Sequence, residues 1–99
     1  MLPEQTGIRL SVLQQIRALA ARYEVHQVIL FGSRARGEHK ERSDIDLAVR
    51  GGDVSGFALA VDEETDTLLR YDVVDLSRPT DATLLENIEK DGVMLYEKV

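Results

Sequence analysis

The sequence predicts one small α/β or α+β domain, and three observations lead to this fold class. The chain has 99 residues, enough for one hydrophobic core and too few for a separate substrate-binding domain. Segments with helical and strand patterns follow one another in the order helix, strand, strand, helix, strand, helix, strand. No repeat, low-complexity stretch or linker interrupts them. We therefore expect a single domain over residues 1–99.

Two regular elements are expected before the first charged loop. Apolar residues recur at helical spacing in the first segment, with arginines and glutamines between them, which predicts a helix from about Ile8 to Tyr23. The next segment, VHQVILF, is short and rich in β-branched residues. It predicts a strand from Val25 to Phe31 that is largely buried at its end, where Gly32 closes it.

The second strand shows polar and apolar residues in alternation. In DIDLAV, residues 44–49, the alternation places two aspartates on one face and Ile45, Leu47 and Val49 on the other, against the core. The sequence RGGD then breaks the chain. Apolar spacing beyond it predicts a helix with an acidic outer side from about Ser55 to Arg70.

Three further elements complete the expected fold. The sequence YDVVDLS predicts a third strand over residues 71–77, and Pro79 prepares a helix near Asp81 to Lys90. A turn at Asp91 and Gly92 leads into a last short strand, VMLYE. The inward positions of the last helix are expected to be Leu84, Leu85 and Ile88.

Composition excludes several classes of function. The chain has no cysteine, which excludes disulfides, thiolate chemistry and any zinc site with a cysteine ligand. A net charge of −6 argues against general binding to nucleic acid, which depends on cations that meet phosphates. No segment is apolar enough to cross a membrane and no secretory signal is seen, so a cytoplasmic protein is expected.

Charge is distributed unevenly along the chain. Between Phe31 and Arg50 there are five cations and four anions, a balance of +1, so the remaining residues carry −7. This segment is therefore the one best suited to bind a small polyanion.

The aspartates of the second strand suggest a metal site. Asp44 and Asp46 project from one face, and a divalent cation between them would allow both to stay ionised. A third carboxylate would allow two metal ions about 3.5–4 Å apart to hold the attacking and leaving oxygens of a displacement at phosphorus. Asp72 and Asp75 lie on opposite faces of the third strand, so only one of them can face the pair.

The residues that follow the first strand suggest a phosphate site. Gly32 allows a phosphate to approach the backbone, and Ser33 can donate both its N–H and its hydroxyl. The sequence SRARG can form one helical turn whose free N–H groups would hold a triphosphate. The cations that can neutralise it are Arg34, Arg36, Lys40 and Arg42.

Some of these residues also have simpler explanations. Arg36 can instead pair with Glu38 or Glu41, and Ser43 can fix the start of the second strand through its backbone. His39 is expected to be exposed. The acidic run of residues 62–66 is expected to be a solvated helix face, which can also dock a basic partner.

The sequence GSRARGEHKERSDIDL resembles the signature of the DNA polymerase beta-type nucleotidyltransferase superfamily: Gly-Ser, ten residues, then Asp-x-Asp. The short chain, and the match from VILFGS through YDVVDLS to GVMLYE, resemble its minimal members. These are the MntA-like antitoxins, which are encoded beside HEPN-domain toxins. The resemblance covers nearly the whole chain and implies a mixed four-stranded sheet flanked by helices.

Residue by residue, the resemblance implies two groups of site residues. The nucleotide-phosphate binders would be Gly32 and Ser33, and the predicted nucleotide-binding group also includes Arg34, Arg36 and Ser43 from the chemistry of the loop alone. The catalytic metal ligands would be Asp44, Asp46 and Asp72, with Asp75 as the fallback for the third acid.

The resemblance also implies an activity and a partner. The activity is transfer of AMP from ATP, with two Mg²⁺ ions, to a tyrosine hydroxyl of a HEPN-domain toxin. Two alternatives stay open. One is a non-catalytic antitoxin that binds and covers its partner; the other is a nucleotidyltransferase that acts on a small molecule or an RNA end. The acidic net charge and the lack of a second domain weaken the last of these.

Overall fold

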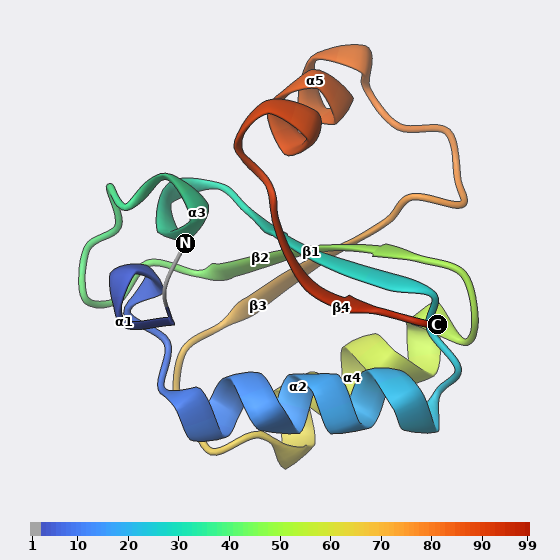
Figure 1. The fold of residues 1–99 in the computed structure, drawn as a ribbon, viewed down its shortest axis with the longest axis horizontal. Coiled ribbons are helices and arrows are strands. Elements are labelled where there is room, and N and C mark those ends of the chain that lie inside the picture. Colours follow the sequence, from blue (N-terminus) through green and yellow to red (C-terminus); the bar gives the residue numbers. More distant parts are fainter. Residues whose placement is uncertain (1–2) are drawn as a thin grey trace.

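A computed structural model describes residues 3–99, which form a four-stranded sheet with helices on both faces (Figure 1). The strand order is β3-β2-β1-β4, with β2 and β3 parallel and β1 antiparallel to both of its neighbours. The predicted fold class and mixed four-stranded sheet are therefore confirmed. The strands are β1 (Gln27–Phe31), β2 (Ile45–Arg50), β3 (Tyr71–Asp75) and β4 (Val93–Glu97).

The helices cover the two faces of the sheet unequally. In Figure 1, α2 and α4 lie together below the sheet, whereas α5 lies above it and the short α3 lies beside the end of β1. The helices are α1 (Pro3–Thr6), α2 (Leu10–Arg22), α3 (Ser33–Arg36), α4 (Val54–Glu64) and α5 (Ala82–Asp91).

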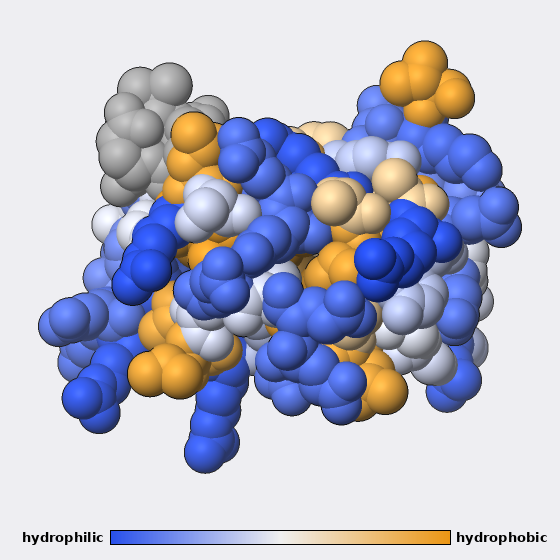
Figure 2. Space-filling view, turned by 90° about the horizontal axis from the view of Figure 1, so that it is seen from below, coloured by the Kyte–Doolittle hydropathy of each residue, from blue (hydrophilic) through white to orange (hydrophobic). Residues whose placement is uncertain are grey.

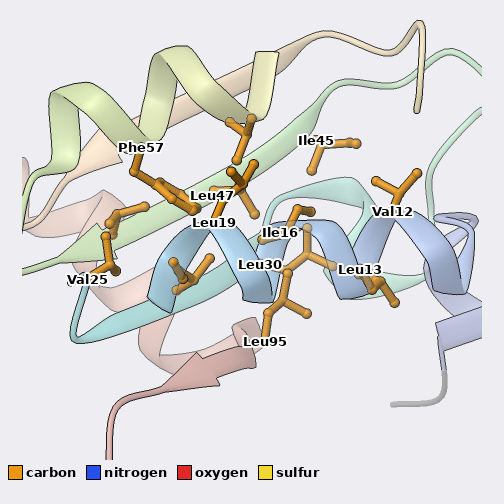
Figure 3. Close-up of a cluster of buried hydrophobic side chains, with 14 of the residues drawn as sticks. Val12, Leu13, Ile16, Leu19, Val25, Leu30, Ile45, Leu47, Phe57 and Leu95 are labelled. Carbon is orange, nitrogen blue, oxygen red and sulfur yellow. The ribbon is translucent and has the colours of Figure 1, made fainter. Parts of the chain in front are cut away.

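The main core lies between the sheet and the pair α2 and α4 (Figure 3). The helical spacing of apolar residues in α2 buries one face of that helix, as predicted. The predicted inward face of β2 is confirmed, because Ile45, Leu47 and Val49 are fully buried in this cluster. Phe57 of α4 and Leu30 of β1 pack into the same core.

A second, smaller core lies on the opposite face, beneath α5. Ile88 of α5 packs with Phe31, Ala48 and Leu76, and the partly buried Leu84 and Leu85 join them as predicted. Strand β2 is therefore buried on both faces at Ala48 and Val49. Asp46 of β2 precedes this covered part and lies on the α5 side of the sheet, and Asp44 lies just before the strand.

The N-terminal helix differs from its prediction. A helix was expected from Ile8, but α1 ends at Thr6 and α2 begins at Leu10. Gly7 has a φ of +70°, and the Thr6 hydroxyl accepts the N–H of Ile8 at 3.1 Å, so the chain turns before α2.

Helix α4 ends at Glu64, and the prediction that it continues to Arg70 is wrong. Thr65 has extended backbone angles, and its hydroxyl donates to the Val61 carbonyl at 2.6 Å. Residues 65–70 therefore form a loop, which leaves Leu68 fully exposed where a buried helical position was expected. The expected first and third strands are each two residues longer than β1 and β3, the second is displaced by one residue from β2, and the last matches β4.

The face formed by α2 and α4 is mainly hydrophilic, with small separate hydrophobic patches (Figure 2). None of the helices within residues 3–99 has the length and apolar character needed to cross a bilayer.

Candidate active site

Asp46 occupies the centre of the candidate site because its strand lies between β1 and β3. In the register of the sheet it is the partner of Phe31 on β1 and of Asp72 on β3. Val74 packs with Ala48 in the core beneath α5, so Asp72 and Asp46, two residues earlier on their strands, share that same face. The two aspartates are therefore direct neighbours on adjacent strands, whose separation in a sheet is about 4.8 Å.

Asp75, the other acid of β3, lies elsewhere. Its register partner is Val49, near the opposite end of β2. One carboxylate oxygen accepts the backbone N–H of Ser77 at 2.9 Å, and the other lies 3.6 Å from the Arg78 guanidinium. Asp75 thus supports the turn after β3, and the structure brings only Asp72 of these two acids beside Asp46.

Asp44 lies just before β2 and is exposed, as is Asp72, while Asp46 is partly buried. In the part of the chain that the structure describes, no group of three or more acidic or histidine side chains converges closely enough to be a ready-made cation site. Separated carboxylates are the arrangement that mutual repulsion favours when no cation is bound.

The electrostatic environment of Asp46 is unfavourable to its charge. Burial raises the pKa of this carboxyl group most, and the nearby charges of Asp72 and Asp44 raise it further. Arg36 and Arg34 lower the pKa but do not cancel the rise. A cation bound here would stabilise the ionised form of Asp46 against burial and the two like charges. The raised pKa of this carboxyl group therefore fits a cation site.

Gly32 brings the phosphate end of the predicted site into contact with Asp46. Its φ is +76°, in the region that favours glycine, and a Cβ atom at this position would overlap the Asp46 carboxylate. Ser33 begins α3 directly afterwards, and the first N–H groups of a helix have no acceptor inside it. Gly-Ser and Asp-x-Asp are therefore adjacent in space, although ten residues separate them in the sequence.

Arg34 is not in the position expected for a phosphate-binding residue. It is only 1% exposed, and its guanidinium donates to the carbonyls of Thr6 at 2.8 Å, Ser43 at 2.9 and 3.0 Å, and Glu41 at 3.2 Å. Burial lowers the pKa of Arg34, and the Asp46 charge opposes that effect. The guanidinium holds the loop between α3 and β2 against the end of α1, so we assign it a structural role and correct the predicted one.

The other predicted polar residues remain near the surface or in the loop. Arg36 is exposed and pairs with Glu38 at 3.0 Å, one of the two pairings expected from the sequence. The Ser43 hydroxyl accepts the N–H of Lys40 at 2.8 Å, and the Ser43 carbonyl accepts from Arg34. Ser43 therefore shapes the loop that leads into β2.

His39 is partly buried, and the expectation that it would be exposed is wrong. Its ring packs where a side chain at Gly7 would lie, beside the Arg34 guanidinium. Its Nδ1 atom is buried and has no hydrogen-bond partner among the described residues. Neither this packing nor the role of Arg34 had a signal in the sequence, because both depend on how α1 folds back onto the loop.

A groove leads away from Asp44 toward α1 and α2. We call the part next to the aspartate the Asp44 groove. It has a volume of ≈ 560 Å³ and continues into a cleft of ≈ 540 Å³ that runs past Ile8 and Val12. The Asp44 groove is lined by Arg42, Asp44, Leu68, Leu69 and Arg70. The sequence did not predict it, because residues 65–70 were expected to be helical.

Known proteins resemble this chain in sequence and in fold. A relative from Methanocaldococcus jannaschii, named "Putative protein adenylyltransferase MJ0604", is 41% identical over 66 residues. The match covers 65% of this chain and 64% of that relative, so the chain spans just under two thirds of the relative's length.

Solved structures show the same fold. A toxin–antitoxin structure with AMP-PNP has a TM-score of 0.65 and 26% identity, and a mutant of the toxin–antitoxin MntA-HpeT has a TM-score of 0.69 and 22% identity. In both cases the match covers 87% of this chain and 73% of the other. At 22% identity the likeness shows the fold alone.

The family model described as "Polymerase beta, Nucleotidyltransferase" matches residues 14–99, from within α2 to beyond β4. This range contains the Gly-Ser pair, Asp-x-Asp and Asp72. The match confirms the resemblance on which the sequence prediction was based, and the chain belongs to the polymerase beta-type nucleotidyltransferase family.

Proposed function

We propose that this chain is a Mg²⁺-dependent nucleotidyltransferase that moves AMP from ATP to a protein hydroxyl, and that it is the antitoxin of a HEPN-domain toxin. The observation that carries the proposal is the position of Asp46, between Gly32 on one side and Asp72 on the other. The family match, the relative's name and the toxin–antitoxin neighbours support it. We also propose that residues 1–99 act as one minimal transferase domain.

The acidic residues fit divalent cations. Asp44, Asp46 and Asp72 offer oxygen ligands on one face of the sheet, and the raised pKa of Asp46 reflects like charges that a cation would neutralise. These three residues would hold Mg²⁺, which when bound would neutralise charge on the phosphate oxygens. Asp75 is not part of this proposed set, because its carboxylate is engaged at the turn after β3.

The other side of Asp46 would bind the triphosphate. The open backbone at Gly32, and the N–H and hydroxyl of Ser33, can donate to phosphate oxygens at the start of α3. Arg36 lies at the surface near Asp46 and can leave Glu38 for a phosphate, because an exposed ion pair contributes little free energy.

The chemistry is a displacement at the α-phosphorus. The acceptor oxygen forms a bond to this phosphorus while the bond to the bridging oxygen breaks, and pyrophosphate leaves. The acceptor hydroxyl loses its proton, and Asp72, which is exposed at the edge of the site, is the carboxylate positioned to take it. The chain's contribution is to align the two substrates and balance their charges.

Transfer of labelled AMP tests the proposal. The purified chain is incubated with α-labelled ATP, Mg²⁺ and the HEPN-domain protein encoded beside it, and the label is expected on that protein. The double variant Asp44→Asn with Asp46→Asn should abolish labelling. Absence of labelling with correctly folded wild-type proteins would disprove the transferase, and full neutralisation of the toxin by the double variant would favour a purely binding antitoxin.

A further inference from the structure

The Asp44 groove has features that the proposed transfer site does not use. Leu68 is fully exposed in it, although removal of a leucine side chain from water is favourable. Arg42 and Arg70 also line it, and their guanidinium groups make no hydrogen bond or ion pair with any residue in the range 3–99. Apolar surface between unpaired cations is typical of a place where another molecule binds.

The charge of the Asp44 groove favours an acidic occupant. Arg42 and Arg70 face a single acid, Asp44, which belongs to the proposed metal site. The adjoining cleft adds Arg9, whose side chain is likewise unpaired within the described residues. That cleft also contains two acids: Glu41, and Asp66, which accepts a hydrogen bond from the Gln15 amide nitrogen at 3.0 Å. The excess of cations is therefore confined to the Asp44 groove itself. The cations nearest Asp44 are therefore available to pair with carboxylates from outside the chain.

The position of the groove in the sheet indicates which substrate it serves. Gly32 and Ser33 follow β1, on one side of Asp46, whereas the groove lies between the beginnings of β2 and β3, on the other. In an in-line displacement the nucleophile enters opposite the leaving group. If the triphosphate lies at Gly32, the acceptor hydroxyl must arrive from the side of β3.

We propose that the Asp44 groove and its continuation bind the acceptor polypeptide beside its hydroxyl-bearing residue and select apolar and acidic side chains there. This inference rests on the proposed function, whose acceptor it specifies. The apolar contacts would come from Leu68 and Leu69 and the ionic ones from Arg42 and Arg70. A nucleoside fits less well, because no aromatic side chain lines either part of the groove to stack on a base.

Peptide binding tests the groove without requiring catalysis. Two short fluorescein-labelled peptides with a central tyrosine between leucines differ only in carrying glutamates or lysines at the remaining positions. By fluorescence anisotropy, the glutamate peptide should bind at least about tenfold more tightly, which is about 1.4 kcal/mol. Arg42→Glu with Arg70→Glu should reverse the preference, and Leu68→Ser should weaken binding of the glutamate peptide.

A matched pair of substitutions controls for net charge. Lys90→Glu with Lys98→Glu changes the charge equally on α5 and after β4, away from the groove, and should keep the preference for glutamate. Equal binding of the two peptides to the wild type would overturn the inference. The inference would also be overturned if Lys90→Glu with Lys98→Glu reduced the preference for the glutamate peptide as much as the double arginine variant. The net charge of the chain would then explain the binding.

Nucleotide binding separates this inference from the proposed function. Binding of AMP-PNP with Mg²⁺ should be unchanged in the single variant Arg70→Glu, while AMP transfer to the glutamate peptide falls. A wild type that selects the glutamate peptide but binds no nucleotide would refute the transferase and retain the groove. If the wild type binds nucleotide but shows no peptide preference, the groove proposal is refuted and the transferase proposal is retained.

Discussion

At the scale of single residues, the site combines a position that requires glycine with an unfavourable charge. Gly32 adopts a positive φ directly against the Asp46 carboxylate, and Asp46 is partly buried beside two like charges. The charge at Asp46 opposes folding, whereas the conformation at Gly32 is accessible to glycine alone, and both features support the proposed chemistry. Substitutions at these positions should therefore affect stability and activity in different ways.

Asp46→Asn should stabilise the fold and remove activity. Since the folded-state pKa of Asp46 is raised, the folded chain holds this proton more tightly than the unfolded chain, and stability falls as pH rises through that pKa. The variant should therefore melt above wild type at neutral pH but not at about pH 3, below the ordinary pKa of aspartate. Each 1 kcal/mol gained raises the Tm of such a domain by about 4–8 °C.

Asp81→Asn is the control for that measurement. Asp81 precedes α5, is exposed and makes no side-chain cap hydrogen bond. The control should show no comparable pH-dependent gain in Tm and should retain AMP transfer. In Asp46→Asn the rate of AMP transfer should fall by more than about 100-fold. A lower Tm for Asp46→Asn at neutral pH would contradict the electrostatic account of this site.

Gly32→Ala should destabilise the chain more than Gly37→Ala. Both glycines have a φ near +75°, but a Cβ at Gly32 overlaps Asp46 whereas a Cβ at Gly37 meets no atom within 4 Å. Backbone strain of about 1–3 kcal/mol is common to both variants, so their difference isolates the overlap with Asp46. Urea unfolding measures this difference in the free energy of unfolding. An equal decrease in the two variants would show that the overlap with Asp46 is relieved at no cost in stability.

At the scale of elements, Arg34 connects α1, α3 and the loop before β2. Its side chain is the largest fully buried one among the described residues, and all of its side-chain hydrogen bonds go to carbonyl groups. A lysine has no planar fork and cannot reproduce these directions. The loop that joins the phosphate and metal ends of the site is therefore held from within.

Arg34→Lys should consequently lower the free energy of unfolding by more than about 2 kcal/mol, because buried carbonyls lose their donors. Arg36→Lys is the matched substitution on the same short helix. It should change stability by less than about 1 kcal/mol, since Arg36 makes only an exposed pair with Glu38. Similar losses in both variants, measured by urea unfolding, would show that the buried hydrogen bonds are unimportant.

Tyr71 links the end of α4 to the beginning of β3. The Thr65 hydroxyl donates to the Val61 carbonyl, so at 2.7 Å it must accept the proton of the Tyr71 hydroxyl. Burial raises the pKa of Tyr71 most, and the charge of Asp62 raises it further.

The raised pKa of Tyr71 predicts a loss of stability in alkali. Unfolded tyrosine ionises near pH 10, so stability should fall as pH rises above about 10, toward the higher folded-state pKa. Tyr71→Phe should remove this part of the alkaline loss of stability. At neutral pH the variant should have a free energy of unfolding lower by about 0.5–1.5 kcal/mol, because the hydrogen bond to Thr65 is lost. Parallel pH dependence of Tm in both proteins would contradict this account.

The sequence predicted the elements that depend on periodicity and the motifs that depend on local spacing. The two faces of β2, the inward side of α5 and the pairing of Gly-Ser with Asp-x-Asp all belong to this class. The end of α4 was missed, because Leu68 and Leu69 continue the helical spacing while the Thr65 hydroxyl ends the helix. The role of Arg34 depends on a contact with Thr6, 28 residues away, which no local pattern encodes.

At the scale of the whole molecule, the sheet is covered unequally. Helices α2 and α4 cover most of one face, while α5 covers only the part of the other face beyond the aspartates (Figure 1). The open part contains the proposed site and borders the Asp44 groove. A bound substrate and partner would provide the remaining wall and exclude water from the reaction.

Mg²⁺ should stabilise the folded chain at neutral pH. A cation that binds only the folded state adds about 2.7 kcal/mol when its concentration is 100 times its Kd. Thermal melting should show a rise in Tm with Mg²⁺ that EDTA reverses. Asp44→Asn should reduce the rise and Asp81→Asn should not, whereas a rise of equal size in both variants would place the cation elsewhere.

The buried guanidinium of Arg34 also has a consequence for motion. Because one side chain holds the carbonyls of Thr6, Glu41 and Ser43, opening of the loop before β2 requires α1 to detach in the same event. Backbone amides of these segments should then exchange with deuterium as one cooperative unit, more slowly than their surface position suggests. The charged loop between α3 and β2 and helix α1 would therefore move together, as one rigid segment beside the proposed nucleotide site.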